Sequence, residues 1–289
     1  MKTAVSTLAF IGKSAEEIIS LAKQHGWAIE FSSGMPYRQD MEKIFTEAKI
    51  ERYAHNYFPA PEKPFVLNLA SSNNDIRNAS IKHCIKGIEL SGIAGSPFFS
   101  AHAGFCIDPK PSELGNRLVQ VEDFNREKHW ELFISSVKNI LAQTENTGID
   151  FLIENNVLAK MNVYDDGSNP LLCVEDAEIL KLTSEINNPR LGILLDTAHL
   201  KVSANTLGFD KDKAVTKLIP VIQCIHHSDN DGVSDTNQLF DSTYWFLKHM
   251  KHFGYHITKK ETRETLHVIE VKKLNKEQVS QQLNILHHA

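Results

Sequence analysis

The stretches IDFLIEN (149–155) and RLGILLD (190–196) are short apolar runs, and a helical pattern at Glu175–Asn187 lies between them. A buried strand, a helix and a second buried strand are typical of a βαβ unit with parallel strands. Outward from this unit, the same alternation predicts strands at Ala4–Ile11, Trp27–Ser33, Ile50–Phe58, Pro97–Phe105, Pro220–His227 and His267–Val271. Eight such units without a Gly/Ser-rich linker predict a single (β/α)8 barrel domain over residues 1–289.

The helical patterns follow the predicted strands closely. They lie at Ser14–His25, Gln39–Lys49, Asn74–Ile93, Val121–Thr147, Glu175–Asn187, Asp210–Leu218, Ser242–Lys251 and Asn275–Leu286. The alternative is an open doubly wound sheet, which would normally carry a glycine-rich phosphate turn after its first strand. The stretch FIGKSAEE (10–17) has one glycine, so the sequence gives no support for nucleotide binding.

The composition indicates a globular cytoplasmic protein with no membrane span. About 42% of the residues are hydrophobic, and no apolar run approaches the roughly 18 residues that a spanning helix requires. The four cysteines form no CxxC pair, as expected for a reduced protein with buried thiols. A net charge of −5 argues against binding nucleic acid through bulk positive charge, and the 14 histidines offer metal ligands.

Six predicted strands in succession each place a residue that can bind a divalent metal at or near the carboxyl end. These residues are His55, His102, Glu154, Asp196, His226 and Glu270, spaced 30 to 52 residues apart. Each has a simpler explanation alone, because a single histidine is often just hydrogen-bonded and Asp196 would suit a helix N-cap. Glu154 and Glu270, however, sit inside apolar strands, where a carboxylate is costly unless it is paired or binds a metal. The six together predict a metal site at the barrel mouth.

The ordered motifs HNYF (55–58), SAHAGF (100–105), LIENN (152–156), LLDTAHL (194–200), IHHSDNDG (225–232) and VIEV (268–271) resemble the xylose isomerase-like barrel superfamily. That superfamily includes sugar and sugar-phosphate isomerases and epimerases, and also endonuclease IV. The isomerase resemblance implies one metal held by Glu154, Asp196, His226 and Glu270. It favours His226 over His227 because the family pattern His-x-x-Asp is matched by His226 and Asp229.

The endonuclease IV branch implies two further ligand sets. His55 and His102 would share Glu154, and His199 would join an Asp-x-His pair. Here that pair reads Asp235-Thr236-Asn237, and Asn237 is a much poorer zinc ligand than histidine. The third set is therefore incomplete, and His55, His102 and His199 are expected to hold a second metal or to orient the substrate.

The resemblance implies a divalent-metal-dependent isomerase or epimerase of carbohydrate metabolism. Glu154 and Glu270 would move a proton next to the carbonyl of a sugar or sugar phosphate, with manganese, zinc, magnesium or cobalt bound. The alternative is an endonuclease IV-like phosphodiesterase acting on DNA. It is ranked second because the loops Asp165–Gly167 and Ser228–Asp235 are acidic, with only Lys160, Lys201 and Lys272 nearby. A barrel that only binds its ligand is third. Barrels of this kind often form homodimers, and the sequence leaves the oligomeric state open.

Overall fold

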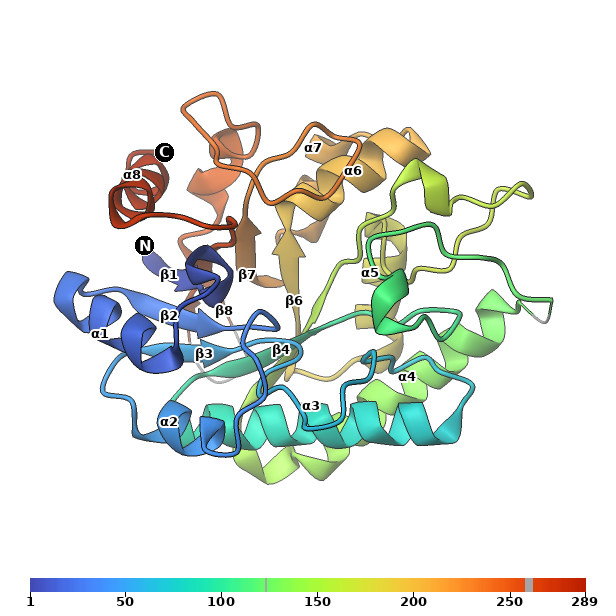
Figure 1. The fold of residues 1–289 in the computed structure, drawn as a ribbon. Coiled ribbons are helices and arrows are strands. Elements are labelled where there is room, and N and C mark those ends of the chain that lie inside the picture. Colours follow the sequence, from blue (N-terminus) through green and yellow to red (C-terminus); the bar gives the residue numbers. More distant parts are fainter. Residues whose placement is uncertain (123, 258–261) are drawn as a thin grey trace.

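Eight parallel strands form the centre of the molecule, which a computed structural model describes at residues 1–122, 124–257 and 262–289. In the order in which they pair, the strands are β3 (Arg52–Ala54), β2 (Ala28–Phe31), β1 (Lys2–Ser6), β10 (Leu266–Ile269), β7 (Ile222–His227), β6 (Leu191–Asp196), β5 (Asp150–Glu154) and β4 (Phe98–His102). A parallel bridge between His55 and Ser100 joins the two outermost strands. The predicted (β/α)8 barrel is thereby confirmed as a nearly closed ring (Figure 1).

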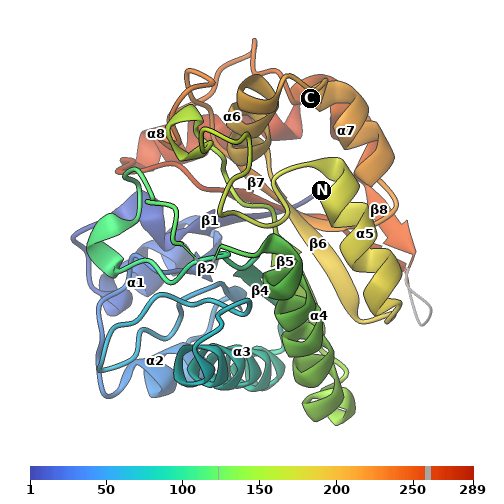
Figure 2. The ribbon, with the colours of Figure 1, turned by 90° about the vertical axis from the view of Figure 1, so that its right-hand side faces the viewer.

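The helices lie outside the ring of strands. They are α1 (Ala15–His25), α2 (Met41–Glu47), α3 (Asn74–Ala94), α4 (Arg126–Gln143), α5 (Asp176–Ile186), α6 (Thr197–Leu207), α7 (Lys211–Leu218) and α8 (Lys276–His287). Figure 2 shows α3, α4 and α5 side by side against the barrel. Local sequence fixes several starting points: Ser14 and Glu17 form a capping box for α1, and Asn125 caps α4 by accepting from the Lys128 N–H. No helix in these described ranges is long and apolar enough to cross a membrane.

Two predicted elements need correction. The predicted helix at Ser242–Lys251 is wrong: residues 242–246 contain turns, and a 3-10 helix covers Leu247–His252. Tyr244 and Phe246 are both buried although they are two residues apart, a spacing that would put them on opposite sides of an α-helix. The chain after β6 also contains α6, which the sequence interpretation omitted. A hairpin of β8 (Tyr255–Ile257) and β9 (Thr262–Glu264) precedes β10.

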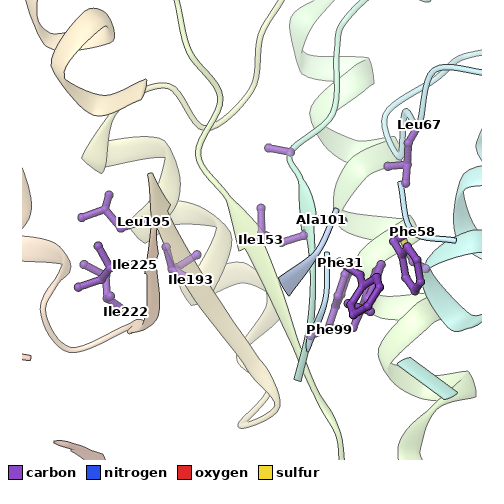
Figure 3. Packing of buried hydrophobic residues seen from close by; sticks show 14 of the residues in the cluster. Phe31, Phe58, Leu67, Phe99, Ala101, Ile153, Ile193, Leu195, Ile222 and Ile225 are labelled. Carbon is purple, nitrogen blue, oxygen red and sulfur yellow. The ribbon is translucent and has the colours of Figure 1, made fainter. Parts of the chain in front are cut away.

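The hydrophobic core has an outer and an inner part. Outside the strands, apolar side chains of the sheet such as Phe31, Ile193 and Ile225 pack beneath the helices (Figure 3). Inside the barrel, a second cluster takes at least one residue from every strand of the ring: Ala4, Ala28, Tyr53, Phe98, Leu152, Leu194, Cys224, Leu266 and Val268. This inner cluster fills the barrel with a packed core.

Side chains alternate along each strand, so the residue two positions beyond the inner cluster points into the barrel again. On six strands that residue is ionisable. The pairs are Ala28 and Glu30, Tyr53 and His55, Leu152 and Glu154, Leu194 and Asp196, Cys224 and His226, and Val268 and Glu270. The register of the sheet also places ionisable residues of neighbouring strands side by side, since Asp196 of β6 lies opposite His226 of β7. The apolar interior is therefore capped by one layer of acids and imidazoles.

Candidate metal centre

The four residues named by the isomerase resemblance converge at the carboxyl end of the barrel. One potential ligand atom from each of Glu154, Asp196, His226 and Glu270 lies within 4.8 Å of the others. All four side chains are 12% exposed or less. His226 Nδ1 lies 3.1 Å from Glu270 Oε2 and 3.5 Å from Glu154 Oε1. The neighbouring His227 points away from this set and contacts His267, with 2.9 Å between ring nitrogens.

A second set of potential ligands shares Glu154. His55 Nε2 and His102 Nε2 each lie 3.2 Å from Glu154 Oε2, and the three ligand atoms again fall within 4.8 Å of one another. His55 is buried, whereas the side chain of His102 is 29% exposed at the mouth. The two oxygens of Glu154 therefore face two different groups: Oε1 faces His226, and Oε2 faces His55 and His102.

The residues of the third set are only partly assembled. His199 Nε2 lies 3.3 Å from Asp235 Oδ2 and 3.9 Å from Asp196 Oδ2. Asn237 is buried with a left-handed backbone (φ 47°), and its carbonyl accepts from the Lys272 N–H. In the described ranges, these residues do not join either ligand set.

Asp229 lies apart from both ligand sets as the structure describes them. Its carboxylate is 2.6 Å from Lys201 Nζ, which also donates to the carbonyl of Asn230. Lys201 is therefore engaged by the loop after β7 and is not a free cation for a substrate phosphate. Of the lysines considered near the mouth, only Lys160 and Lys272 remain.

The imidazoles of His55 and His199 are oriented by contacts of their Nδ1 atoms. His55 Nδ1 lies 2.9 Å from Ser100 Oγ, and His199 Nδ1 donates to the carbonyl of Asn155 over 2.9 Å. Asn155 also bonds the backbone of Asp196 through both polar side-chain atoms. The rings are thus held in one orientation before any ligand binds.

The sequence interpretation missed a further residue of this layer, Glu30 on β2. It is completely buried, and its Oε2 lies 2.9 Å from His226 Nε2. Glu30, His55 and His226 form another group whose potential ligand atoms lie within 4.8 Å of one another. The signal was present in the sequence, because AIEF (28–31) places a carboxylate in an apolar strand just as LIEN and VIEV do.

Burial and close charges shift the pKa values of the acids in opposite directions. Burial raises the pKa of Asp196 to about 8, against the attraction of His199. Burial would also raise the pKa of Glu270, but His226 outweighs it and lowers that pKa to about 2. For Glu154, the surrounding imidazoles overcome burial and hold the pKa well below its ordinary range. Asp196 is therefore the acid of this group that favours its neutral form at pH 7.

The pKa values of the histidines are likewise shifted in opposite directions. Burial alone would lower the pKa of His226, but Glu30 and Glu270 raise it well above the ordinary value. His199 also has a raised pKa, because Asp196 and Asp235 outweigh burial. Burial dominates at His102 and lowers its pKa to about 4. The layer thus keeps positive charge next to its carboxylates.

The donor atoms fit a divalent cation. Both carboxylate oxygens of Glu154 and Oδ2 of Asp196 are buried, and none accepts a hydrogen bond within the described part of the chain. Buried carboxylate oxygens in this state are costly unless positive charge compensates them. The neighbouring imidazoles supply some of that charge to Glu154, and a divalent cation would add to it. Oxygen and imidazole ligands without sulfur suit manganese, magnesium, cobalt or zinc.

Comparisons with known proteins agree with this architecture. The sequence model of a family described as "Xylose isomerase-like TIM barrel" matches residues 12–270. A "Probable endonuclease 4" of Mesomycoplasma hyopneumoniae (strain J) is 26% identical over 193 residues, which cover 63% of this chain and 60% of that protein. The chain therefore spans less than two thirds of this relative's length.

Solved structures show the same fold. A D-tagatose 3-epimerase-like protein superposes with a TM-score of 0.71 and 18% identity, covering 100% of this chain and 99% of its own. The TTHB071 protein from Thermus thermophilus, in crystals soaked with ZnCl2, gives a TM-score of 0.63 with 15% identity and the same coverage. At these identities the similarity establishes the fold alone.

Proposed function

Because this chain belongs to the xylose isomerase-like TIM-barrel family, we propose that it is a divalent-metal-dependent isomerase or epimerase of a sugar or sugar phosphate. The observation that carries the proposal is the convergence of Glu154, Asp196, His226 and Glu270 from four neighbouring strands. The epimerase-like protein of the same fold supports a sugar as the class of substrate.

The four converging residues would hold the cation. When bound, a divalent cation supplies a Lewis acid that polarises a carbonyl and stabilises the negative charge of an enediolate. Glu270 is the better placed of the two glutamates to reach a substrate, since its side chain is 12% exposed and that of Glu154 is 1% exposed. Its low pKa keeps it a carboxylate at neutral pH, as a proton acceptor requires.

We assign Glu270 to removal of the proton from the carbon next to the carbonyl. Glu154, after taking up a proton from water, is assigned to the return of a proton to the substrate, and Glu270 releases its own proton to water. His102 is exposed at the mouth, where it can orient a substrate hydroxyl. His199 holds Asp235 beside Asp196 and shapes the same wall of the site. These residues act on a substrate whose oxygens face the carboxyl ends of β5, β6, β7 and β10.

A second candidate is metal-dependent phosphodiester hydrolysis, as the name of the endonuclease 4 relative suggests. The geometry that favours it is the second ligand set, in which His55 and His102 meet Glu154. Against it stand Asn237 in place of the histidine of the Asp-x-His pair and the engagement of Lys201 by Asp229. A DNA enzyme needs cations that contact the phosphate backbone, so we rank this function second.

The two functions can be separated by assays on one preparation. Purified protein is analysed for bound metal and incubated in D2O with a panel of ketoses and ketose phosphates, and exchange of the proton next to the carbonyl is followed by NMR. The same protein is incubated with a duplex that contains an abasic site. We expect proton exchange without cleavage. Cleavage without exchange would overturn the isomerase proposal.

The Glu270→Gln variant tests the assigned proton transfer. Loss of the catalytic carboxylate should lower proton exchange by at least ~100-fold, the usual contribution of a positioned acid or base. Glu89→Gln, on the exposed face of α3, is the matched control and should retain full exchange. Undiminished exchange in Glu270→Gln, with metal still bound, would contradict the role of Glu270.

A further inference from the structure

We infer that Glu30 is a positioning residue that fixes the orientation of His226 and strengthens the proposed metal centre. The inference rests on the proposed metal site and concerns a residue that the motifs of the chain do not include. Glu30 lies at the middle of β2, next to Ser6 of β1 in the sheet register. It reaches across the barrel interior to His226 on β7, and the two residues are 196 positions apart in sequence.

The two nitrogens of His226 have separate tasks in this arrangement. Nδ1 faces the ligand set, 3.1 Å from Glu270 Oε2 and 3.5 Å from Glu154 Oε1. Nε2 faces Glu30 Oε2 over 2.9 Å, and since a carboxylate can only accept, Nε2 must donate. Nδ1 also faces a carboxylate, that of Glu270, and donates to it when no cation is bound. Because Glu30 holds the proton on Nε2, Nδ1 is the nitrogen that can give up its proton to bind a cation.

Glu30 differs from the other groups that orient imidazoles in this site. Ser100 and the Asn155 carbonyl, which contact His55 and His199, are neutral, whereas Glu30 carries a carboxylate. A carboxylate that accepts from a ligating histidine makes the imidazole a stronger donor to the metal and restricts its rotation. Of these three contacts, the one from Glu30 to His226 should strengthen the binding of the imidazole to a metal most.

The burial of Glu30 argues against a role in stability alone. Its exposed fraction is 0%, and Oε1 has no hydrogen-bond partner in the described ranges of the chain. A buried carboxylate that is only half satisfied costs stability relative to an apolar residue of similar size. The contact between Glu30 Oε2 and His226 is the feature that explains why a carboxylate is kept at this buried position despite the cost in stability.

The test is the metal affinity of Glu30→Gln, which keeps the shape of the side chain and removes its charge. Dissociation constants for Co²⁺ and Zn²⁺ are measured on the full chain by competition with a chromophoric chelator. We expect binding to weaken about 10–100-fold in Glu30→Gln, the usual effect of losing such a contact, and the Co²⁺ absorption spectrum to change. Glu51→Gln, at the opposite end of the barrel beside β3, is the control and should bind as the wild type does.

Metal-free unfolding separates positioning from a structural role. Glu30→Gln should unfold at a temperature no lower than the metal-free wild type, whereas a structural role predicts a lower temperature with unchanged metal affinity. That second result would overturn the inference. Unchanged affinity in a folded Glu30→Gln would also overturn it while leaving the proposed function intact. A wild type that binds neither metal would overturn both.

A measurement on the wild type avoids reliance on the variant. With zinc bound, nitrogen-15 correlation spectra of the imidazoles report which nitrogen of each ring carries the proton. We expect His226 to carry it on Nε2. A proton on Nδ1 of His226 would contradict the inference even if Glu30→Gln fails to fold.

Discussion

Asp196 serves the helix and the site at the same time. Its Oδ1 accepts from the backbone N–H of His199 over 2.7 Å and caps α6, while its Oδ2 is buried toward the ligand set without a hydrogen bond in the described residues. The cap and the site were alternative interpretations of this residue in the sequence. The structure shows that one carboxylate satisfies both geometries, because its two oxygens point to different partners.

The raised pKa of Asp196 makes metal affinity depend on pH. Burial raises that pKa to about 8, so in the metal-free protein the carboxyl is largely protonated at pH 7 and a cation must displace the proton. Affinity should therefore rise as pH increases from 6 toward 8, and Asp196 should contribute part of that rise. In Asp196→Asn the affinity should be lower, and the dependence should weaken by about one proton per metal.

Metal titrations at several pH values, followed by calorimetry, check this prediction. Asp165→Asn, which changes an exposed acid on the loop after β5, is the control and should keep the wild-type dependence of affinity on pH.

The raised pKa of Asp196 also has a consequence for the stability of the metal-free fold. Since the folded-state pKa of Asp196 is raised, its contribution to stability is complete below about pH 4 and is lost as pH rises through about 8. A pH-independent affinity would contradict the burial of a protonated Asp196.

At the scale of single residues, sequence predicted which side chains gather but not how they pair. Glu154 and Glu270 stood out because carboxylates are rare inside apolar strands. The same argument applies to Glu30, whose strand AIEF (28–31) lies outside the motifs that indicated the other ligands. The sequence could not show that Lys201 is neutralised by Asp229, because that contact joins α6 to the loop after β7.

At the scale of elements, the alternation of apolar runs with amphipathic stretches predicted the eight barrel strands within a few residues. Helix α6 was not predicted, because its first turn lies in the motif LLDTAHL (194–200), where Asp196 and His199 indicated ligands. The predicted helix at 242–251 failed because Tyr244 and Phe246 pack around His227 on the outer side of β7. Tertiary packing decided that segment, and local periodicity could not reveal it.

Helix α3 packs so closely on β4 that one added methyl group should destabilise the protein. A Cβ at Gly87 would lie 2.3 Å from Phe99 Cε2, and the Phe99 ring is completely buried. We expect Gly87→Ala to lower the free energy of unfolding by about 1–3 kcal/mol, as overpacking usually does. Urea denaturation measures the change.

Gly92 on the same helix is the matched control for Gly87. A Cβ there would meet Ile149 Cγ1 at 3.5 Å, an ordinary contact. Gly92→Ala should be neutral or stabilise the protein by about 0.5–1 kcal/mol through helix propensity. Equal effects of both substitutions would show that α3 does not pack against Phe99 as described.

At the scale of the whole molecule, the barrel carries an apolar interior topped by a layer of charge. The acids and imidazoles of that layer come from strands β2, β3, β5, β6, β7 and β10 or from the residue that follows them, so the site forms only when these strands have come together. Metal binding should therefore be coupled to folding of the barrel as one unit. The strand order follows from the βα repeat, whereas the pairing of ligands across the ring depends on register.

Added metal should raise the thermal midpoint of the protein. A cation at about 100 times its dissociation constant stabilises the folded state by about 2.7 kcal/mol, which corresponds to a rise of about 4–5 °C for a protein of this size. Differential scanning fluorimetry with zinc or manganese, and with a chelator, measures it. Glu154→Gln should lose most of the rise, and Glu89→Gln should keep it. A midpoint that does not respond to metal would argue against a built metal site.

The position of Glu154 between two groups of ligands has a thermodynamic consequence. One oxygen faces His226 and the other faces His55 and His102, so a cation in either group changes the charge and orientation that the other group experiences. Two binding equilibria that share a component are linked, and linkage is reciprocal. By whatever factor the first ion alters the affinity for the second, the second alters the affinity for the first. The metal affinity of one group of ligands therefore cannot be changed without a change in the affinity of the other group while Glu154 belongs to both.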